Sequence, residues 1–538
     1  MTETMIDSVF FVQRVPKSFF DMVKLPTSEK DKWYAAIDEE YSSLKRLNTF
    51  EVIETASVPP GAQILDTTYV FTIKTDPARH KARLCDQETA EQTLAEIFST
   101  VARSENFKLL LTLVASLGWT YYICDVKNAF VNAKLTKPAY IKIPFGVPGD
   151  RRTHVWKLNK ALYGLRRSPA EWNRELTKTL LSMGFRKTVS DWNFFVKDIG
   201  KDKILLAFHV DDGLITCNNQ AVLDEVMKDL SAKYELKVNR NPDSFLGISI
   251  NRNVAEKLIY LNQSHYIDQC VAKFDCPDKS SSVPMDPGFQ PLITDADTKL
   301  EAQYPYRSII GALLHIARMT RPDILYAVSI LSKSLSNPQK RHWEAAKRVL
   351  AYLRDSKHES LALGALRKDN SFLLHGYADS TWGDDLENRR SRSGGVLFFN
   401  GSLISAWSKQ QPTPALSSTE SEYQAMCLAT QEVMYFRQLL KEIGYFQLVP
   451  TIIFGDNKGA LDLSVSTKQH NRVKHIDIKF HFIRDQVEMK TIELEYVPTT
   501  EQIADIFTKP LAKGPFHKLK QHLHVQLWGG VTTTQSSV

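Results

Sequence analysis

Two adjacent aspartates lie between two apolar runs, and this arrangement constrains the fold more than any other feature of the chain. The pair, Asp211 and Asp212, lies in residues 209–213 and separates residues 204–208 from residues 214–217. Both flanking runs have the composition of β-strands, and Asp-Asp-Gly favours the backbone angles of a tight turn. The sequence therefore predicts a β-hairpin with its turn at Asp-Asp-Gly.

Two adjacent carboxylates at a turn repel each other unless a cation neutralises them. Mg²⁺ prefers carboxylate oxygens together with the oxygens of phosphate groups. An Asp-Asp hairpin is therefore a candidate metal platform for phosphoryl transfer. The alternative is an ordinary solvated turn, which is the more frequent meaning of an isolated Asp-Asp pair; the rest of this chain favours the metal platform.

The size and composition are those of an ordinary globular chain with several domains. With 538 residues, 43% hydrophobic and 24% charged, the chain is too long for one core. The net charge of +7 permits a polyanionic partner. No apolar run is long enough to cross a bilayer and no signal-peptide pattern is visible, so no membrane partner is expected. The scattered cysteines, without a Cys-x-x-Cys pair, indicate a reducing compartment.

Apolar periodicity divides the chain into regions. Helical patterns are clearest at residues 27–47, 169–184 and 306–353. Strands return near residue 371. From there the order strand, strand, strand, helix, strand, helix predicts a separate α/β domain that ends near Leu511.

A third carboxylate, Asp125, lies in a predicted strand that spans residues 123–130. It can join Asp211 and Asp212 if the two strands are neighbours. Two-metal catalysis requires such a set, with metal ions about 3.5–4 Å apart.

The segments around these carboxylates resemble the reverse transcriptase of copia-type LTR retrotransposons. The matching segments, in the family's order, are Asp125-Val126-Lys127-Asn128-Ala129-Phe130, Lys160-Ala161-Leu162-Tyr163-Gly164-Leu165-Arg166-Arg167-Ser168-Pro169 and His209-Val210-Asp211-Asp212. Weaker matches at Trp33, residues 81–84 and residues 245–248 fall in the same order. The resemblance covers roughly residues 25–511.

The resemblance implies a role for each matching residue. The catalytic carboxylates that hold Mg²⁺, with Mn²⁺ as the alternative ion, would be Asp125, Asp211 and Asp212. The residues that bind the nucleotide would be Lys81, Arg83, Val126, Phe130 and Gly164. Phe130 would be the steric gate against a ribose 2′-hydroxyl, with a core aromatic as the alternative; surface charge is the alternative for the two cations. Tyr163 and Trp172 are assigned to the core.

The chain departs from the family pattern in two places. His209 replaces the usual Tyr before Val-Asp-Asp. After Leu84 the family continues with a basic, glycine-containing segment, whereas residues 85–91 are acidic and the segment is shorter. Because this acidic segment follows Lys81 and Arg83 closely, the sequence predicts weak nucleotide binding by the polymerase.

A second acidic set lies in the C-terminal third of the chain. Asp379 and Asp456 each follow a predicted strand. Between them, a helix capped at residue 417, 418 or 419 extends to Gly444.

Two glutamates near the start of this helix compete for one role. The apolar stripe of the helix, extended backwards from Met426, meets Glu422 and misses Glu420. Glu422 is therefore expected to face the sheet, where a carboxylate is rare unless it is paired or metal-bound.

The second set resembles the carboxylates of RNase H. The resemblance implies catalytic, metal-binding roles for Asp379, Glu422, Asp456 and Asp505. Asp477, in a segment that also matches the copia-type pattern, is the alternative fourth carboxylate. A solvated ion-pair cluster is expected where Asp384 and Asp385 lie close to Arg389 and Arg390.

The expected fold is an α+β multidomain protein: a right-hand polymerase with fingers and palm and a helical thumb or connection, followed by an RNase H-like α/β domain. The expected boundaries are an N-terminal extension at 1–24, fingers and palm at 25–255, thumb or connection at 256–365, the RNase H-like domain at 366–512 and a C-terminal tail at 513–538.

The expected function is that of an RNA-directed DNA polymerase with ribonuclease H activity. Its partners would be an RNA template, a DNA primer, an RNA–DNA hybrid, dNTPs and other polyprotein products such as capsid and integrase. Cytoplasmic virus-like particles are the expected location, with the nucleus as the alternative. No aspartic-protease motif or zinc cluster is visible, so a processed product, a fragment, or a decayed or domesticated copy is expected. Two alternatives stay open: a chain with RNase H activity alone, and a non-catalytic nucleic-acid-binding protein.

Overall fold

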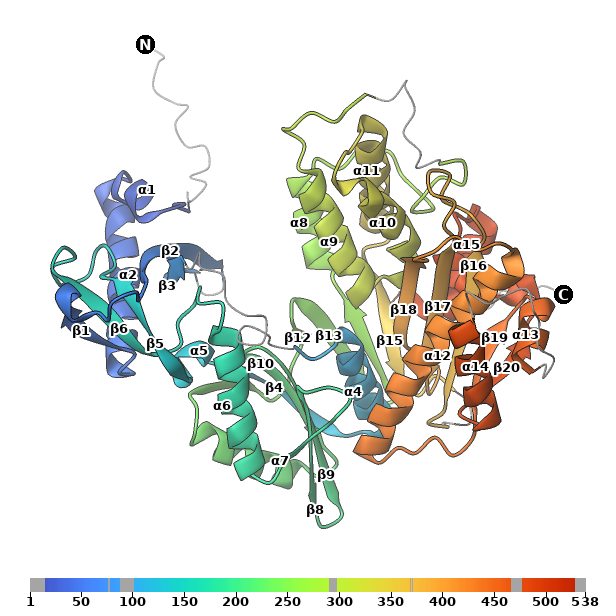
Figure 1. The fold of residues 1–538 in the computed structure, drawn as a ribbon, viewed down its shortest axis with the longest axis horizontal. Coiled ribbons are helices and arrows are strands. Elements are labelled where there is room, and N and C mark those ends of the chain that lie inside the picture. Colours follow the sequence, from blue (N-terminus) through green and yellow to red (C-terminus); the bar gives the residue numbers. More distant parts are fainter. Residues whose placement is uncertain are drawn as a thin grey trace.

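The computed structural model describes residues 15–75, 78–87, 101–289, 298–367, 369, 371–465 and 477–527. These residues form four β-sheets with helices packed on them. Figure 1 shows the first sheet on the left, the last on the right, and the second between and below them. Within the described ranges, no helix has both the length and the apolarity that crossing a bilayer requires.

The N-terminal sheet has the strand order β1-β6-β5-β2-β3. Its elements are α1 (Phe19–Val23), α2 (Thr27–Arg46), β1 (Phe50–Glu54), η1 (Thr55–Ser57), β2 (Ile64–Thr75), β3 (Ala78–Gln87), β5 (Lys134–Lys142) and β6 (His154–Lys160). Helix α2 begins at Thr27 as predicted, and its fully buried Trp33 packs edge-on against Phe71 of β2. This contact fixes α2 on the sheet beside β3.

The second sheet, here named the hairpin sheet, is antiparallel with the order β11-β4-β10-β9-β8-β7. Its elements are α4 (Ser104–Leu117), β4 (Thr120–Val126), α5 (Ala129–Asn132), α6 (Ser168–Ser182), β7 (Arg186–Lys187), β8 (Phe194–Ile199), β9 (Asp202–His209), β10 (Asp212–Cys217), α7 (Gln220–Ser231) and β11 (Leu236–Asn239). Strand β4 ends at Val126, so the predicted strand over 123–130 is too long and Phe130 lies in α5.

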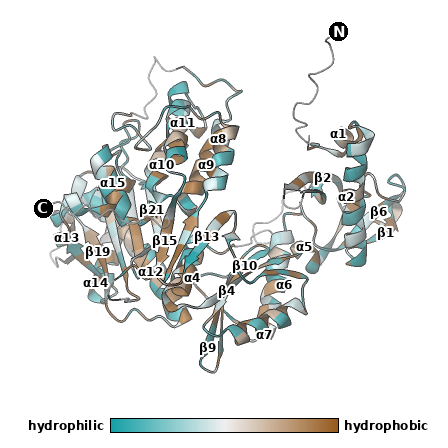
Figure 2. Ribbon diagram, turned by 180° about the vertical axis from the view of Figure 1, so that it is seen from behind, coloured by the Kyte–Doolittle hydropathy of each residue, from teal (hydrophilic) through white to brown (hydrophobic). Residues whose placement is uncertain are grey.

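Helices cover both faces of the hairpin sheet. On one face, α6 and α7 bury Trp172, Leu176 and Leu223 against the strands. On the other face, α4 buries Phe107 and Leu110 in the large core that continues into the C-terminal part. Figure 2 shows apolar residues concentrated where α4, α12 and β15 meet. The strands are therefore apolar on both sides, and polar residues gather at the strand ends.

The third sheet joins segments that are distant in sequence, in the order β12-β13-β14-β15-β21. The elements of this region are β12 (Ser244–Phe245), β13 (Ile248–Asn253), β14 (Leu258–Asn262), α8 (Ser264–Lys273), α9 (Tyr306–Met319), η2 (Pro322–Ile324), α10 (Leu325–Ser332), η3 (Lys333–Leu335), α11 (Lys340–Asp355), β15 (Glu359–Gly364), α15 (Lys513–His522) and β21 (Val525–Leu527). The helices predicted between 306 and 353 are confirmed as α9 to α11.

The expected C-terminal tail from residue 513 is wrong for its first half. Helix α15 buries Phe516 and Leu519, and Lys520 of this helix forms a buried ion pair with Glu359 of β15 at 2.7 Å. Strand β21 then pairs with β15. The amphipathic spacing of α15 and the β15 partner explain why this segment is ordered.

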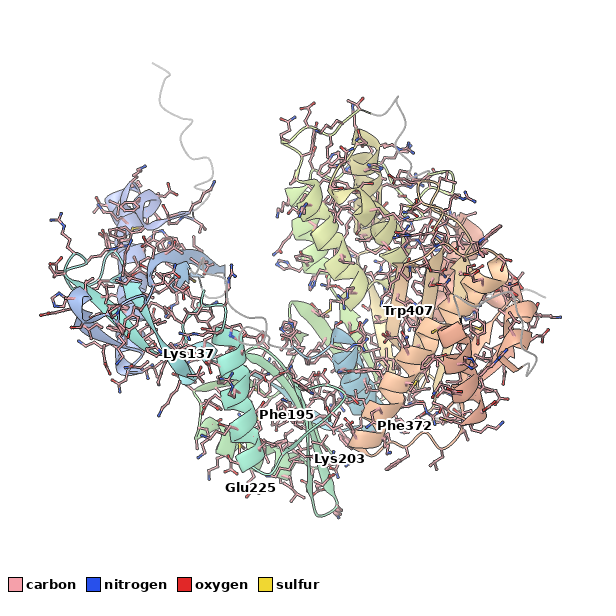
Figure 3. The ribbon with its side chains drawn as sticks, in the orientation of Figure 1. Lys137, Phe195, Lys203, Glu225, Phe372 and Trp407 are labelled. Atoms are coloured by element: carbon pink, nitrogen blue, oxygen red, sulfur yellow. The ribbon has the colours of Figure 1, made fainter. Side chains whose placement is uncertain are left out.

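The C-terminal sheet has the order β18-β17-β16-β19-β20 and mixed direction. Its elements are β16 (Leu374–Thr381), β17 (Arg392–Phe399), β18 (Ser402–Gln410), α12 (Ser418–Ile443), β19 (Thr451–Gly455), α13 (Lys458–Val465), α14 (Asp477–Glu488), β20 (Ile492–Tyr496), η5 (Thr499–Glu501) and η6 (Ile503–Phe507). Trp407 of β18 lies inside this part of the molecule, where its ring covers Gly395 (Figure 3). The parallel strands β16 and β19 bring Asp379 and Asp456 to the same edge.

Two candidate active sites

The hairpin that carries Asp211 and Asp212 begins its turn one residue earlier than predicted. Asp212 is the first residue of β10 and pairs with His209 of β9, so the turn residues are Val210 and Asp211. Val210 has φ 61°, an unfavourable conformation for a β-branched side chain. A positive φ at only the first turn residue is typical of a type II′ turn, which ordinarily takes glycine there. The Asp-Asp-Gly turn prediction is therefore wrong in register.

Contacts from two neighbouring elements hold the strained turn. The indole Nε1 of Trp172 donates a hydrogen bond to the carbonyl oxygen of Val210 at 2.7 Å. The backbone N–H of Val126 donates to the carbonyl oxygen of Asp211 at 3.0 Å. Strained residues persist where the surroundings fix them, and they are frequent at functional sites. Trp172, which the sequence assigned to the core alone, therefore also positions the turn.

Gly213 is needed for close packing rather than for the turn. A Cβ atom at this position would lie 2.8 Å from the Sγ of Cys124 and 2.7 Å from the ring of Phe208. The small residue lets β10 pair closely with β4 and β9.

The structure brings together the three hairpin carboxylates, Asp125, Asp211 and Asp212. Asp125 of β4 lies directly opposite Asp212 of β10 in the strand register, and Asp211 lies in the adjoining turn. Burial and the charges of the other two raise the pKa of Asp212 to about 6. Burial, followed by the charge of Asp125, also raises the pKa of Asp211. A divalent cation would relieve this repulsion, and an all-oxygen donor set suits Mg²⁺ or Mn²⁺.

A cleft of about 730 Å³ connects the hairpin carboxylates with the N-terminal sheet. Its lining includes Asp125 and Asp211 on one side and Lys81 and Arg83 of β3 on the other. Val126 also lines it. The cleft therefore places cations opposite carboxylates, the arrangement that a metal-bound polyphosphate requires.

Tyr163 is a cleft residue that sequence reasoning missed. The guanidinium of Arg83 lies 4.1 Å from the centre of its ring, and the ring of Phe130 lies 4.7 Å away on another side. Gly164, with φ 101°, lets this segment approach the backbone of Asp86. The three predicted nucleotide residues Arg83, Phe130 and Gly164 thus meet around Tyr163. The one sequence signal for Tyr163 is its position inside the matching segment of residues 160–169.

Glu40 of α2 also lines the cleft and was not predicted. Its carboxylate accepts a hydrogen bond from the backbone N–H of Leu84 at 3.1 Å, and burial raises its pKa. This contact fastens α2 to β3 beside the two cations.

Asp86 does not face the cations of β3. Side chains alternate across the strand, so Lys81 and Arg83 lie on one face while Ala82, Leu84 and Asp86 are buried on the other. The expectation that Asp86 opposes a bound triphosphate is therefore corrected. Glu88 and Glu91 lie outside the described residues.

The second candidate site is a compact group of three carboxylates. The ligand atoms of Asp379, Glu422 and Asp456 all lie within 4.8 Å of one another, and no other such group occurs among the described residues. Asp379 lies in β16, Glu422 in the first turns of α12, and Asp456 directly after β19. Carboxylate oxygens alone are the donors that Mg²⁺ and Mn²⁺ prefer, so the residues fit a divalent ion.

The two glutamates of α12 have different roles. Ser417 accepts a hydrogen bond from the N–H of Glu420 at 3.1 Å, and Glu420 accepts one from the N–H of Leu416 at 2.8 Å. These contacts cap the helix start. Glu422 is the glutamate whose carboxylate reaches Asp379 and Asp456.

Asp505 of η6 lies beside this group and extends it. Its carboxylate forms an ion pair with Lys509 at 2.8 Å. The alternative fourth carboxylate, Asp477, is the first residue of α14, and its side chain is not described. Residues 474–476, part of the same matching segment, lie outside the described ranges.

Burial and mutual repulsion dominate the electrostatics of these C-terminal carboxylates. Burial first, and then the charge of a neighbouring carboxylate, raises the pKa of Asp379 and of Glu422 well above the usual values. Burial likewise raises the pKa of Asp505. The hydroxyl of Thr508 donates to Asp379, and that of Thr499 donates to Asp456 at 2.7 Å. The group is thus preformed and short of positive charge.

The expected solvated ion-pair cluster at residues 384–390 is wrong. Asp385 is buried and pairs with Lys333 at 2.9 Å, and Asp384 pairs with the fully buried Arg392 at 3.3 Å. These carboxylates anchor the loop between β16 and β17, and their cations come from outside the expected cluster.

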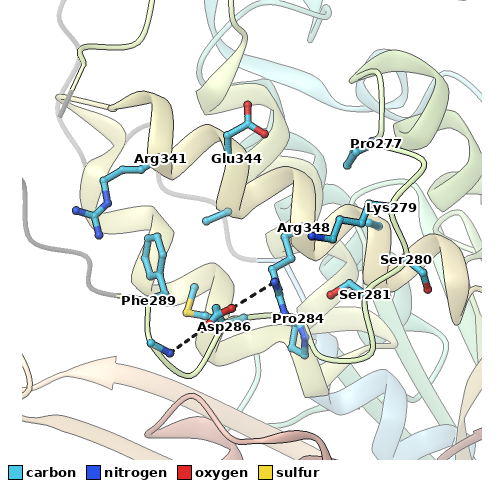
Figure 4. A pocket seen from close by; sticks show the side chains of 14 residues that line it. Pro277, Lys279, Ser280, Ser281, Pro284, Asp286, Phe289, Arg341, Glu344 and Arg348 are labelled. Atoms are coloured by element: carbon cyan, nitrogen blue, oxygen red, sulfur yellow. Dashed lines mark hydrogen bonds and ion pairs between the residues drawn. The ribbon is translucent and has the colours of Figure 1, made fainter. Parts of the chain in front are cut away.

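Another cavity, of about 580 Å³, lies between α11 and residues 277–289, and none of the predicted site residues lines it (Figure 4). Arg348 pairs with Asp286 at 3.5 Å, and Arg341 lies over the ring of Phe289. Its lining combines two carboxylates, Asp286 and Glu344, with three cationic side chains, so its chemistry differs from that of the two candidate sites.

Comparison with known proteins gives a consistent family. A family model described as reverse transcriptase (RNA-dependent DNA polymerase) matches residues 48–287. The chain is 32% identical over 523 residues to the retrovirus-related Pol polyprotein of transposon TNT 1-94 from Nicotiana tabacum, covering 94% of this chain and 39% of the polyprotein. It is 31% identical over 306 residues to a Ty5-1 transposon protein of Saccharomyces cerevisiae, covering 56% of this chain and 96% of that protein.

Two solved structures are also similar. LC11-RNase H1 shares 14% identity with a TM-score of 0.21, covering 26% of this chain and 93% of its own. A foamy viral protease-reverse transcriptase in complex with double-stranded DNA shares 14% identity with a TM-score of 0.25, covering 89% of this chain and 72% of its own.

Proposed function

Because the chain belongs to the family of copia-type retrotransposon Pol polyproteins with a reverse transcriptase domain, we propose that it is an RNA-directed DNA polymerase with ribonuclease H activity. The observation that carries this proposal is the pair of separate carboxylate groups, one facing a cationic strand across a cleft and one buried and compact. The chain spans about two-fifths of the length of the tobacco polyprotein that it matches.

The cleft is proposed as the polymerase site. Asp125, Asp211 and Asp212 would hold divalent ions, which when bound lower the pKa of the primer hydroxyl and stabilise the pyrophosphate leaving group. Lys81 and Arg83 would bind the triphosphate, because they are the cations across the cleft from these carboxylates.

Tyr163, which lines the cleft, and the residues packed around it would select the nucleotide. Phe130 packs on Tyr163, whose ring supports Arg83, so the sugar and the triphosphate would be positioned by one connected group of side chains. Phe130 would crowd a ribose 2′-hydroxyl. Val126 and Gly164 would complete the floor of the site.

The C-terminal carboxylates are proposed as the ribonuclease H site. Asp379, Glu422, Asp456 and Asp505 would hold the ions, and the hydroxyls of Thr499 and Thr508 orient two of the carboxylates. Since the group is preformed, binding an ion requires little rearrangement.

The wider assignments follow the same proposal. Residues 25–255 would form fingers and palm, 256–365 the thumb or connection, and 366–512 the RNase H-like domain. Strand β21 shows that residues beyond 512 also belong to the folded body. The partners would be an RNA template, a DNA primer, dNTPs, RNA–DNA hybrid and other polyprotein products, in cytoplasmic virus-like particles or the nucleus.

Two assays on the purified chain test the function. Primer extension on an RNA template with dNTPs and Mg²⁺ should yield DNA, and a labelled RNA–DNA hybrid should yield cleaved RNA. Cleavage without extension would support a chain that retains RNase H activity alone. Hybrid binding without either reaction would support a non-catalytic nucleic-acid-binding protein.

A further inference from the structure

An exposed tryptophan closely follows one of the C-terminal carboxylates in the chain. Trp382 follows Asp379 by three residues and is 51% exposed, although large apolar side chains are usually covered. Its indole Nε1 donates to the carbonyl oxygen of Ala415 at 2.9 Å. Ala415 lies two residues before Ser417, the cap of α12, which is the helix that carries Glu422. Trp382 therefore bridges two segments that each present a catalytic carboxylate.

Further apolar side chains accompany this tryptophan. Leu416, next to its hydrogen-bond partner, is 74% exposed, and Leu386 in the same loop is 50% exposed. Leu416 is held in place because its N–H donates to Glu420. The apolar surface thus rests on fixed backbone on both sides.

The loop that carries Trp382 is ordered by internal contacts. The N–H of Gly383 donates to the Ser391 hydroxyl at 3.0 Å, and the N–H of Arg389 donates to the Asp385 carbonyl at 2.7 Å. Asp385 is tied to Lys333. Such a loop presents a preformed surface and loses little entropy on binding.

Positive charge borders the same surface. The guanidinium of Arg389 lies over Gly383, immediately after Trp382. Arg389 and the adjacent Arg390 are exposed, and neither forms an ion pair within the described part of the chain. Asp385 and Asp384 of this loop pair with Lys333 and Arg392, so these two acids leave both arginines to a polyanion.

We propose that Trp382, Leu386 and Leu416, bordered by Arg389 and Arg390, form a docking surface that holds an RNA–DNA hybrid over the C-terminal carboxylates. The apolar side chains would pack on sugar edges, and the arginines would contact phosphates on either side. The inference rests on the proposed ribonuclease H function. Continuity with the carboxylate group and the bordering positive charge favour a nucleic acid over a protein partner.

The decisive measurement is hybrid affinity by fluorescence anisotropy, in Ca²⁺ so that the RNA stays intact. Trp382→Ala should weaken binding of the full chain about tenfold, as expected for one aromatic platform. In Mg²⁺ the same variant should raise KM for hybrid cleavage by a similar factor with little change in kcat. Arg389→Gln should weaken binding less and reduce its salt dependence by about one phosphate contact.

Two further variants separate docking from structural support. Trp382→Phe keeps the ring and removes the N–H that binds Ala415, so it should retain most of the affinity. If Trp382→Phe loses as much hybrid affinity as Trp382→Ala, then the hydrogen bond to Ala415 matters rather than the aromatic ring, and the proposal is overturned. Mg²⁺-induced thermal stabilisation should be unchanged in both variants, because neither touches a metal ligand.

Trp192 provides a matched control on the hairpin sheet. It is 54% exposed, close to the value for Trp382. The neighbouring Val189 contacts Glu442, twenty residues along α12 from Glu422, or about 30 Å of helix. Trp192→Ala should therefore leave cleavage KM unchanged.

The outcomes separate the inference from the proposed function. Hybrid binding by the unchanged chain with equal binding by Trp382→Ala would overturn the docking surface alone. Absence of hybrid binding by the unchanged chain would overturn both. A loss shared equally with Trp192→Ala would mean general instability and would also overturn the inference.

Discussion

The two carboxylate groups differ in how much of the site exists before a substrate arrives. The C-terminal group is compact and buried, with three ligand atoms within 4.8 Å. The hairpin group lies at one wall of an open cleft, and its cationic partners lie on a different sheet. A site for hydrolysis needs only water and one bound strand, whereas a site for synthesis must admit a nucleotide at every cycle. A compact, preformed group suits the first task, and an open cleft suits the second.

The compact group carries electrostatic strain, while the hairpin carries backbone strain. Asp379 and Glu422 are buried with like charges, which raises the pKa of both. At the hairpin, Val210 adopts φ 61° and is held by Trp172. The first kind of strain is relieved by a cation and the second is not, so the two sites should respond differently to metal removal.

One helix connects the regions without sharing a ligand. Helix α12 carries Glu422 near its start, and further along Glu432 pairs with Arg103 at 2.8 Å. The N–H of the adjacent Ala102 donates to Phe208 in β9, the strand that leads to the Asp211 turn. The sites are therefore joined through packing while their chemistry remains separate.

The largest expected effect is the loss of one activity with the other preserved. Asp211→Asn should abolish DNA synthesis, and Glu422→Gln should abolish hybrid cleavage. Each loss should be on the order of a thousandfold or more, because each substitution removes a proposed metal ligand. Primer extension and hybrid cleavage are measured on each variant. Glu420→Gln is the matched control, and it should retain cleavage because Glu420 caps α12.

If Asp211→Asn also lost cleavage, the two sites would be coupled chemically and the comparison would fail. If Glu420→Gln lost cleavage while Glu422→Gln did not, the helix register would be wrong.

The second effect is on stability without metal. Since the folded-state pKa of Glu422 is raised, the folded state binds more protons than the unfolded state between the two pKa values. Stability in EDTA should therefore fall as the pH rises above about 5. Glu422→Gln should flatten this slope and raise Tm at alkaline pH by about 2–4 °C, the shift for about 1 kcal/mol.

Thermal unfolding at pH 5.5 and 8.5 in EDTA measures this effect, and Mg²⁺ should stabilise the unchanged chain more than the variant. Asp211→Asn, at the more open site, should change the slope less. An identical slope in all three proteins would show that the compact group is not strained.

The third effect concerns the strained turn. Trp172→Phe removes the hydrogen bond to the Val210 carbonyl and keeps most of the packing. DNA synthesis should fall about tenfold, since a lost hydrogen bond of about 1–1.5 kcal/mol shifts the turn away from its active conformation. Steady-state kcat for extension measures the loss, and hybrid cleavage is the internal control. Equal loss of both activities would show that Trp172 matters for global stability alone.

The structure clarifies what the sequence could predict. Periodicity and local pattern predicted the carboxylates at strand ends and the choice of Glu422, because the direction of side chains repeats regularly along strands and helices. The local sequence pattern did not predict the register of the turn, because the conformation of Val210 depends on Trp172, a residue 38 positions away. The Arg83–Tyr163 contact joins residues that are even further apart in the sequence. The alternation of side chains along β3 places Asp86 on the buried face, so its closeness to Arg83 in the sequence does not bring its charge to the cleft.

The smallest expected effect tests that last correction. Asp86 is buried on the face of β3 opposite Lys81 and Arg83, so its charge should not reach the nucleotide. Asp86→Asn should leave the KM for dNTP within about twofold of the original value, whereas Arg83→Gln should raise it about tenfold or more because a charge-assisted contact is lost. KM for dNTP at low and at moderate salt distinguishes the two, since an exposed charge effect weakens with salt. A clear drop in KM for Asp86→Asn, largest at low salt, would restore the electrostatic argument and place the acidic segment at the nucleotide. An unchanged KM instead leaves the cationic face of β3 free to serve the cleft, and explains how an acidic residue next to Arg83 is compatible with a polymerase site.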